Sequence, residues 1–138
     1  MNSIRACTFI PILVLATSCN GGHEPAPSPS GSANASSVSI TPADRKEAMT
    51  LFSSLCVTCH GDTGHGDGPG AAAIDPKPRS FADPAWQDSV TDSHIQKVIL
   101  LGGAAVGKSP MMPAQPQLKG KHAVLAAIVE KIRSYRGK

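Results

Sequence analysis

Two cysteines and a histidine stand close together near the middle of the chain, in the order Cys56-Val57-Thr58-Cys59-His60. Two thiols at this spacing can add to the two vinyl groups along one edge of a porphyrin, and the imidazole beside the second thiol can then reach the iron. The motif therefore predicts one covalently attached c-type haem, held by Cys56 and Cys59, with His60 as an axial ligand.

Other chemistries for these two thiols fit the sequence less well. A disulfide between Cys56 and Cys59 would leave His60 without a role. A thioredoxin-like redox pair is expected in a strand–helix–strand unit, of which the sequence shows no sign. A zinc site needs two more ligands at a recognisable spacing, and the remaining histidines do not supply a second cluster. Covalent haem attachment is the best interpretation of the motif.

The composition of the chain agrees with a small domain that a cofactor completes. Its 138 residues suffice for one domain, and its 13 glycines, 12 prolines and 4% aromatics predict a thin core with many loops. A large apolar group held by covalent bonds would complete such a core. The 13 basic and 10 acidic residues give a formal charge of +3 without a basic stripe, which argues against a nucleic-acid-binding protein.

Residues 1–18 have the pattern of a secretory signal peptide. One early charge, Arg5, is followed by an apolar run that contains Pro11 and is too short to span a membrane comfortably. The small residues before Cys19 resemble a bacterial lipoprotein signal, although Ala16 stands where that signal prefers Leu. The resemblance predicts lipidation of Cys19. The alternative is ordinary cleavage nearby and a soluble periplasmic product.

Residues 19–40 are expected to form a flexible linker behind the lipidated Cys19. The segment consists largely of Gly, Pro, Ser and Ala, and no large apolar side chain precedes Val38. Such a segment cannot bury enough surface to offset the entropy of ordering it. We therefore expect an exported protein that is tethered to a membrane on its periplasmic side, with one folded domain over residues 41–138.

Three helices and no strand are expected in this domain. Thr41 suits an N-cap, with Pro42 and Asp44 at the positions that favour a helix start, and the first helix runs directly into Cys56. Apolar residues recur at helical spacing in all three helices. The expected helices cover residues 41–56, 91–101 and 121–135, with apolar faces formed by Ala48, Phe52 and Leu55, by Ile95, Val98 and Ile99, and by Val124 or Leu125, Ile128, Ile132 and Tyr135.

The Gly/Asp-rich segment 61–70 follows the cysteine motif. A phosphate cradle is disfavoured because no strand precedes the segment and no Gly-Lys-Ser/Thr follows it, and the spaced acids of an EF-hand are missing. A turn-rich loop around the edge of a cofactor is the better interpretation. The chain then continues through the Pro-stiffened segment 75–79, and Phe81 and Trp86 are expected in irregular structure.

The segment from about Thr41 to Tyr135 resembles a class I cytochrome c. The resemblance rests on Phe52 four residues before the first haem cysteine, on the Cys-x-x-Cys-His-Gly sequence with its Gly-rich loop, on a Met-Pro after a Gly/Lys/Ser loop, and on a C-terminal helix. It implies an all-α cytochrome c fold, with three to four helices wrapped around one covalently bound haem. It also implies a monomeric one-electron carrier that is not an enzyme, or an electron-transfer subunit of a larger oxidoreductase.

The family pattern places a methionine that precedes a proline on the second axial position of the iron. In Ser109-Pro110-Met111-Met112-Pro113 this implies Met112, with Met111 as the alternative. A thioether ligand favours ferrous iron, raises the reduction potential and fills the sixth coordination position. Ligation of the iron by two histidines, His60 with His65, His94 or His122, is a less favoured alternative.

The resemblance also implies roles for residues around the haem. The family uses a proline carbonyl to accept the proton of the proximal imidazole, and Pro76 or Pro78 are the candidates. Arg79 and Trp86 are candidates for hydrogen bonds to a haem propionate, although Trp86 also suits the core. The helix crossing is expected to pair Ala48 and Phe52 with Ile128 and Ile132. Lys131 stands where family members often have an aromatic, and Tyr135 is the residue that would compensate.

Redox protein partners are expected to contact an exposed haem edge. Lysines would surround this edge and form small, transient contacts, although they also fit an ordinary solvated surface. The lysines concerned are Lys77, Lys108, Lys119 and Lys121. The chief functional alternative is a haem-based ligand sensor or peroxidase with an open sixth position on the iron.

Overall fold

The structure is a computed structural model that describes residues 38–138. The predicted signal peptide, Cys7, Cys19 and most of the predicted linker lie outside the described residues. Residues 38–138 form helices and no strand, which confirms the all-α prediction. None of the helices in this range is long and apolar enough to cross a bilayer.

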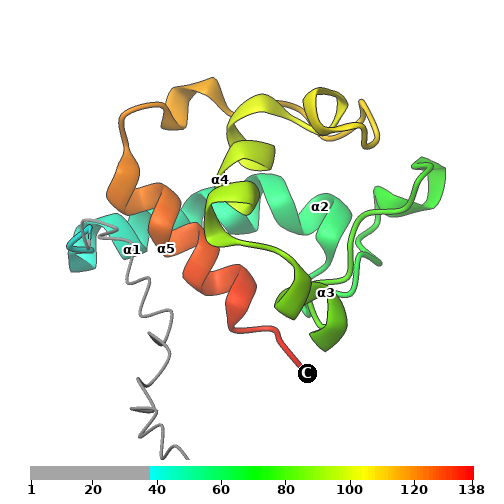
Figure 1. The fold of residues 1–138 in the computed structure, drawn as a ribbon, viewed down its shortest axis with the longest axis horizontal. Helices are drawn as coiled ribbons and strands as arrows, with labels where there is room; N and C mark the ends of the chain where they lie inside the picture. Colours follow the sequence, from blue (N-terminus) through cyan, green and yellow to red (C-terminus); the bar gives the residue numbers. More distant parts are fainter. Residues whose placement is uncertain (1–37) are drawn as a thin grey trace, which may run out of the picture. The chain divides into compact units, whose positions relative to one another are not determined.

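Five α-helices are joined by turns of other helical types (Figure 1). The run from residue 42 to residue 60 is continuous, so the domain has four separate helical segments, as expected from the resemblance. The elements are α1 (Pro42–Leu51), the π-helical turn η1 (Phe52–Cys56), α2 (Val57–His60), the 3-10 turn η2 (Ala71–Ala73), α3 (Pro84–Ser89), α4 (Asp92–Leu101), the 3-10 turns η3 (Ala104–Val106) and η4 (Pro116–Leu118), and α5 (His122–Arg133).

Helix α1 begins where the sequence predicted. The Asp44 backbone N–H donates to the Thr41 hydroxyl at 3.2 Å, and the Thr41 backbone N–H donates to the Asp44 carboxylate at 2.9 Å. This capping box satisfies donors that the first turn of a helix leaves without partners. Pro42 at the first helical position loses no hydrogen bond there.

The π-helical turn changes which residues face the core before the cysteine motif. The Val57 N–H donates to the Phe52 carbonyl, five residues back, so one extra residue is accommodated in this turn. Cys56 and Val57 pack against the core cluster that contains Phe52, and Leu55 turns outward and is 47% exposed. The placement of Leu55 on the apolar face was wrong because it assumed α-helical spacing throughout.

Helices α1 and α5 cross and form the centre of the core (Figure 1). Ala48 on α1 has no exposed surface, and this small side chain allows close approach of the two helices. Phe52, Ile128 and Ile132 are each less than 5% exposed, as the predicted crossing requires. At the surface, Arg45 of α1 pairs with Glu130 of α5.

Tyr135 contributes an aromatic ring to the core next to Phe52 and Phe81. The Tyr135 ring lies 6.0 Å from the Phe52 ring and 6.3 Å from the Phe81 ring, and the residue is 5% exposed. Its hydroxyl donates to the Asp62 carbonyl at 2.8 Å, which ties the C-terminus to the loop after the cysteine motif. The Lys131 ammonium lies 4.4 Å from the centre of the Tyr135 ring, a cation–π distance.

Helix α3 was not expected from the sequence, which placed Trp86 in irregular chain. Asp83 caps it by accepting from the Ala85 N–H at 2.9 Å, and Pro84 occupies its first position. The Asp-Pro pair is a start signal, but six residues are too few for a periodic pattern. Helix α4 begins after the predicted cap Thr91 and ends at Gly102, whose φ of +79° requires glycine.

Candidate functional site

A cavity of about 540 Å³ lies between α2, the segment that leads into α3, helix α4 and the loop that carries Met112. Its size is within the range of cofactor and ligand sites in proteins. Most of the side chains that line it are apolar, and they include Phe81, Trp86, Ile95 and Val98. The cavity can therefore bury a large, flat, apolar group.

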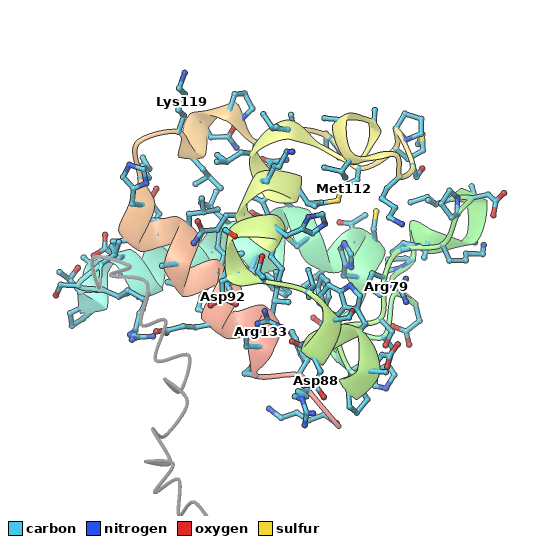
Figure 2. The ribbon with its side chains drawn as sticks, viewed as in Figure 1. Arg79, Asp88, Asp92, Met112, Lys119 and Arg133 are labelled. Atoms are coloured by element: carbon cyan, nitrogen blue, oxygen red, sulfur yellow. The ribbon has the colours of Figure 1, made fainter. Side chains whose placement is uncertain are left out.

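Most of the residues that the sequence predicted to contact a haem meet at this cavity. His60, Pro76, Arg79, Trp86 and Met112 all line it. In Figure 2, Met112 lies in the upper part of the view and Arg79 lies below it.

Cys56 and Cys59 are not among the residues that line the cavity, but they lie on the same continuous helical run as His60. Cys56 is three residues from Cys59 and four from His60, a spacing that brings it close to each of them on the helix surface. Both thiols are free, and both residues are half-buried. Burial raises the pKa of Cys56 to about 11, and the nearby Cys59 charge adds to the shift. The Cys56 sulfur is therefore a protonated thiol at neutral pH.

His60 presents a neutral imidazole to the cavity. Burial lowers its pKa, while the hydrogen bond to the Arg79 carbonyl acts in the opposite direction. The Nδ1 atom lies 3.2 Å from the Arg79 carbonyl oxygen, which can only accept, so Nδ1 carries the hydrogen. This tautomer leaves the Nε2 lone pair free for a metal.

The carbonyl that holds His60 was assigned to the wrong residue in the sequence prediction. Neither Pro76 nor Pro78 makes this contact, which comes from Arg79. The Pro78 carbonyl instead faces Gly66, where it would lie only 2.3 Å from a Cβ atom. The Gly-rich loop thus approaches the chain at Pro78, and the carbonyl one residue later reaches the imidazole.

Phe81 packs directly on the imidazole of His60. The two ring centres are 4.3 Å apart, with an angle of 15° between the planes. Phe81 is 6% exposed, and its N–H donates to the Gly64 carbonyl at 2.6 Å. The sequence prediction missed this role. Nothing in the sequence indicates which residue a lone aromatic side chain after a Pro-rich segment packs against.

Of the two adjacent methionines, Met112 points toward the cavity and Met111 does not. Met112 lines the cavity and is half-buried, whereas Met111 is 61% exposed. The Gly103 N–H donates to the Met112 carbonyl at 3.0 Å. A Cβ on Gly103 would lie 2.1 Å from the Ser109 carbonyl, so this glycine lets the Met112 loop approach the end of α4 closely.

The rim of the cavity is cationic, but with fewer lysines than expected. Lys77 and Lys108 line the cavity, and the Lys77 ammonium also donates to the Ala72 carbonyl at 2.7 Å. Lys119 and Lys121 do not line it. Figure 2 shows Lys119 pointing outward at a distance from Met112 and Arg79, and Lys121 instead pairs with Glu47.

Arg79 and Trp86 lie where hydrogen bonds to a bound acid group are possible. The Arg79 side chain is 52% exposed at the cavity and lies 3.9 Å from the Asp83 carboxylate. Trp86 is half-buried, and its ring centre is 5.7 Å from that of Phe81, so it also contributes to the core.

The histidines other than His60 have different surroundings. His65 is exposed on the Gly-rich loop, with its Nδ1 atom 3.1 Å from the Thr63 hydroxyl, and His122 is exposed at the start of α5. His94 is exposed in the first turn of α4 and also lines the cavity, so it is the one of the three rival histidines that lies at the site. Within residues 38–138 no group of three His, Cys, Asp or Glu side chains is arranged to hold a metal ion.

Comparison with known proteins agrees with these features. The model of the family described as Cytochrome c matches residues 45–135, which is more than half of the chain. No curated protein and no solved structure matches the chain.

The close approach of the Gly-rich loop to the cysteine motif yields a prediction. A Cβ on Gly68 would lie 2.4 Å from the Val57 carbonyl and 2.5 Å from the Thr58 carbonyl, so Gly68→Ala must displace the turn between the cysteines. We expect a loss of about 1–3 kcal/mol in the free energy of unfolding, measured by denaturant titration.

Gly70→Ala is the matched control on the same loop. Its Cβ would lie 3.1 Å or more from its neighbours, and its φ of −82° suits alanine. We expect a smaller loss for this variant. Equal losses for the two variants would contradict a special constraint at Gly68.

Proposed function

The chain belongs to the cytochrome c family, and from this premise we propose that it is a one-electron carrier whose haem iron is held by His60 and Met112. The family binds a covalent c-type haem and transfers electrons through it. The observation that carries the proposal is that His60 and Met112 line one cavity, while two free thiols lie on the helical run that ends at His60. The bound haem supplies an iron that alternates between the ferrous and ferric states.

The residues of this site fit such a group. The apolar lining suits a porphyrin, and Cys56 and Cys59 can each form one thioether bond along its edge. The neutral His60 imidazole has the protonation state that a metal ligand requires, with its other nitrogen already held by the Arg79 carbonyl. The chain thus presents a fixed nitrogen donor to one side of the cavity.

Met112 supplies the second donor in this proposal, and the exposed Met111 does not. A thioether is a soft ligand that stabilises ferrous iron and raises the reduction potential. A filled sixth position also disfavours binding of small ligands to the iron. The position of Met112 in the cavity therefore supports an electron carrier over a haem-based sensor or a peroxidase.

Replacement of the two methionines separately tests the axial ligand. Met112→Ala is expected to abolish the weak long-wavelength ferric absorption band of methionine ligation, to lower the reduction potential and to allow rapid binding of carbon monoxide. Met111→Ala, the matched control, is expected to change none of these. The measurements are optical spectra and a redox titration of the holoprotein. An unchanged spectrum in Met112→Ala would exclude it as the ligand.

We also propose that redox partners approach the rim that carries Lys77 and Lys108. Both lysines line the cavity, so a bound cofactor would be exposed close to them. Positive charge at this rim attracts acidic surfaces and accelerates encounter, an effect that salt screens. Lys119 and Lys121 are set apart from this surface by their positions in the fold.

Charge reversal at the rim tests this docking surface. Lys108→Glu is expected to slow oxidation of the reduced protein by ferricyanide several-fold at low ionic strength, because the oxidant is an anion. Lys119→Glu changes the net charge equally but lies away from the cavity, so its effect should be small. Stopped-flow rates at low and high salt are the measurement. Equal effects of the two variants would contradict a local docking surface.

For the cellular location, we propose export and lipid attachment at Cys19, on the basis of the sequence alone. The apolar run and the small residues before Cys19 support cleavage after residue 18. Two or more acyl chains on the new N-terminus would hold the protein at the periplasmic side of a membrane. The electron carrier would then act close to membrane-bound partners, or as a subunit of a membrane-bound oxidoreductase.

Cys19→Ser tests the lipid anchor. We expect the unaltered protein to be recovered with membranes and to carry the mass of a lipid-modified N-terminus, measured by mass spectrometry. The variant should lose the added mass and leave the membrane fraction, with its haem still attached. A mature protein whose N-terminus lies elsewhere, without lipid, would contradict the proposal.

A further inference from the structure

A buried glutamine joins three separate parts of the structure. Gln87 on α3 is 4% exposed, and its side-chain amide donates to the Phe81 carbonyl at 2.7 Å and to the Ile132 carbonyl at 3.0 Å. Its side-chain oxygen accepts from Arg133 at 2.8 Å. The amide group is therefore fixed in one orientation, with each of its polar atoms occupied.

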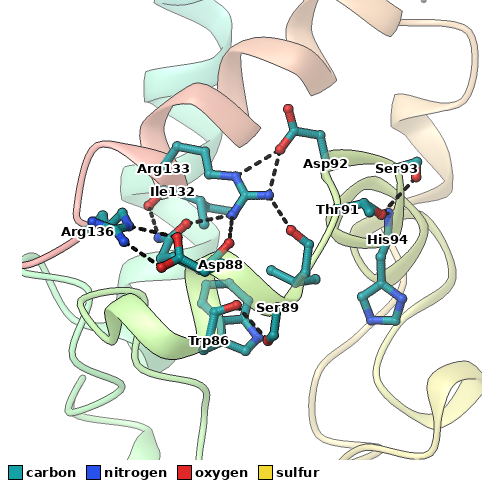
Figure 3. A network of polar contacts seen from close by, with 12 residues as sticks. Trp86, Asp88, Ser89, Thr91, Asp92, Ser93, His94, Ile132, Arg133 and Arg136 are labelled. Carbon is teal, nitrogen blue, oxygen red and sulfur yellow. Dashed lines mark hydrogen bonds and ion pairs between the residues drawn. The ribbon is translucent and has the colours of Figure 1, made fainter. Parts of the chain in front are cut away.

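Arg133 holds this glutamine from the last turn of α5. One of its terminal nitrogens also donates to the Gln87 backbone carbonyl at 2.6 Å, and the other donates to the Val90 carbonyl at 2.6 Å. The Nε atom donates to the Asp92 carboxylate at 2.8 Å, as Figure 3 shows. The Arg133 side chain is only 29% exposed, so these contacts are partly shielded from water.

The segment that Gln87 holds is the one that orients the imidazole of His60. The Phe81 carbonyl is bound by Gln87, and the Phe81 ring stacks on His60 at 4.3 Å. Two residues earlier, the Arg79 carbonyl accepts the hydrogen on the His60 Nδ1 atom. A continuous set of contacts thus leads from Arg133 through Gln87 and segment 79–81 to His60.

We propose that Gln87 and Arg133 are positioning residues that set the reduction potential by fixing the hydrogen bond on the His60 Nδ1 atom. The inference rests on the proposed ligation of the iron by His60. A firm hydrogen bond from Nδ1–H to a carbonyl makes the imidazole a stronger donor through its other nitrogen. A stronger donor stabilises ferric iron, and release of segment 79–81 should therefore raise the potential.

Gln87→Met tests the inference because it keeps roughly the same side-chain volume. It removes the amide N–H groups that donate to Phe81 and Ile132 and the amide oxygen that accepts from Arg133. We expect a higher reduction potential, and a His60 Nδ1–H that exchanges with solvent roughly tenfold faster in the ferrous protein. The methionine absorption band should remain. The measurements are a redox titration and NMR hydrogen exchange on the holoprotein.

Arg133→Lys is the second, milder variant. It retains a positive charge, and its ammonium can still donate to some of the oxygens that accept from Arg133. Its potential and exchange rate should lie between those of the unaltered protein and Gln87→Met. Arg136→Met is the matched control, because Arg136 pairs with the exposed Asp88 next to Gln87 and does not contact segment 79–81 (Figure 3). It should leave both quantities unchanged.

The inference would be overturned if Gln87→Met and Arg133→Lys both lowered the melting temperature but left the reduction potential and the exchange rate of the His60 Nδ1–H unchanged. Equal shifts in Arg136→Met would do the same. The proposed function is tested apart from this result, because covalent haem and the methionine band are measured in the unaltered protein. Their absence would refute the ligation itself, whatever the variants show.

Discussion

The site depends on one contact, the hydrogen bond between the His60 Nδ1 atom and the Arg79 carbonyl. His60 is the last residue of α2, so the helix fixes its backbone but leaves the imidazole free to rotate about its side-chain bonds. Only a partner from another part of the chain can fix the ring. The Arg79 carbonyl fixes the tautomer, and the Phe81 ring fixes the plane of the imidazole.

The long loop between α2 and α3 brings this partner into place. The Gly61 N–H donates to the Val57 carbonyl, and the φ of +76° at Gly61 ends the helix directly after His60. The chain then returns along the cysteine motif, where Gly68 packs against backbone that would exclude any side chain. The loop can reverse direction within this short distance because glycine tolerates the required conformations and close approaches.

The parts of the structure that the sequence predicted are those with local signals. The cap at Thr41, the helix end at Gly102 and the apolar faces of the last two helices depend on residues close in sequence. The cysteine motif is equally local, and so is the Met-Pro pair that indicates Met112. Leu55 was misplaced because nothing in the sequence marks the π-helical turn over Phe52–Cys56, and its extra residue shifts the face on which Leu55 lies.

The contacts around His60 that the sequence did not predict join distant segments. The choice among the carbonyls of Pro76, Pro78 and Arg79 depends on where the Gly-rich loop meets the chain, which spacing alone does not determine.

Long-range packing also places the aromatic ring that follows Lys131 in the chain. Tyr135 lies one helical turn later and enters the core between Phe52 and Phe81, while its hydroxyl reaches the Asp62 carbonyl. Tyr135 thus supplies an aromatic ring to the core just after the end of α5. Lys131 keeps its charge at the surface and its ammonium over the same ring. One aromatic side chain near the C-terminus therefore links the helix crossing to the segment that holds His60, because its ring lies near both Phe52 and Phe81.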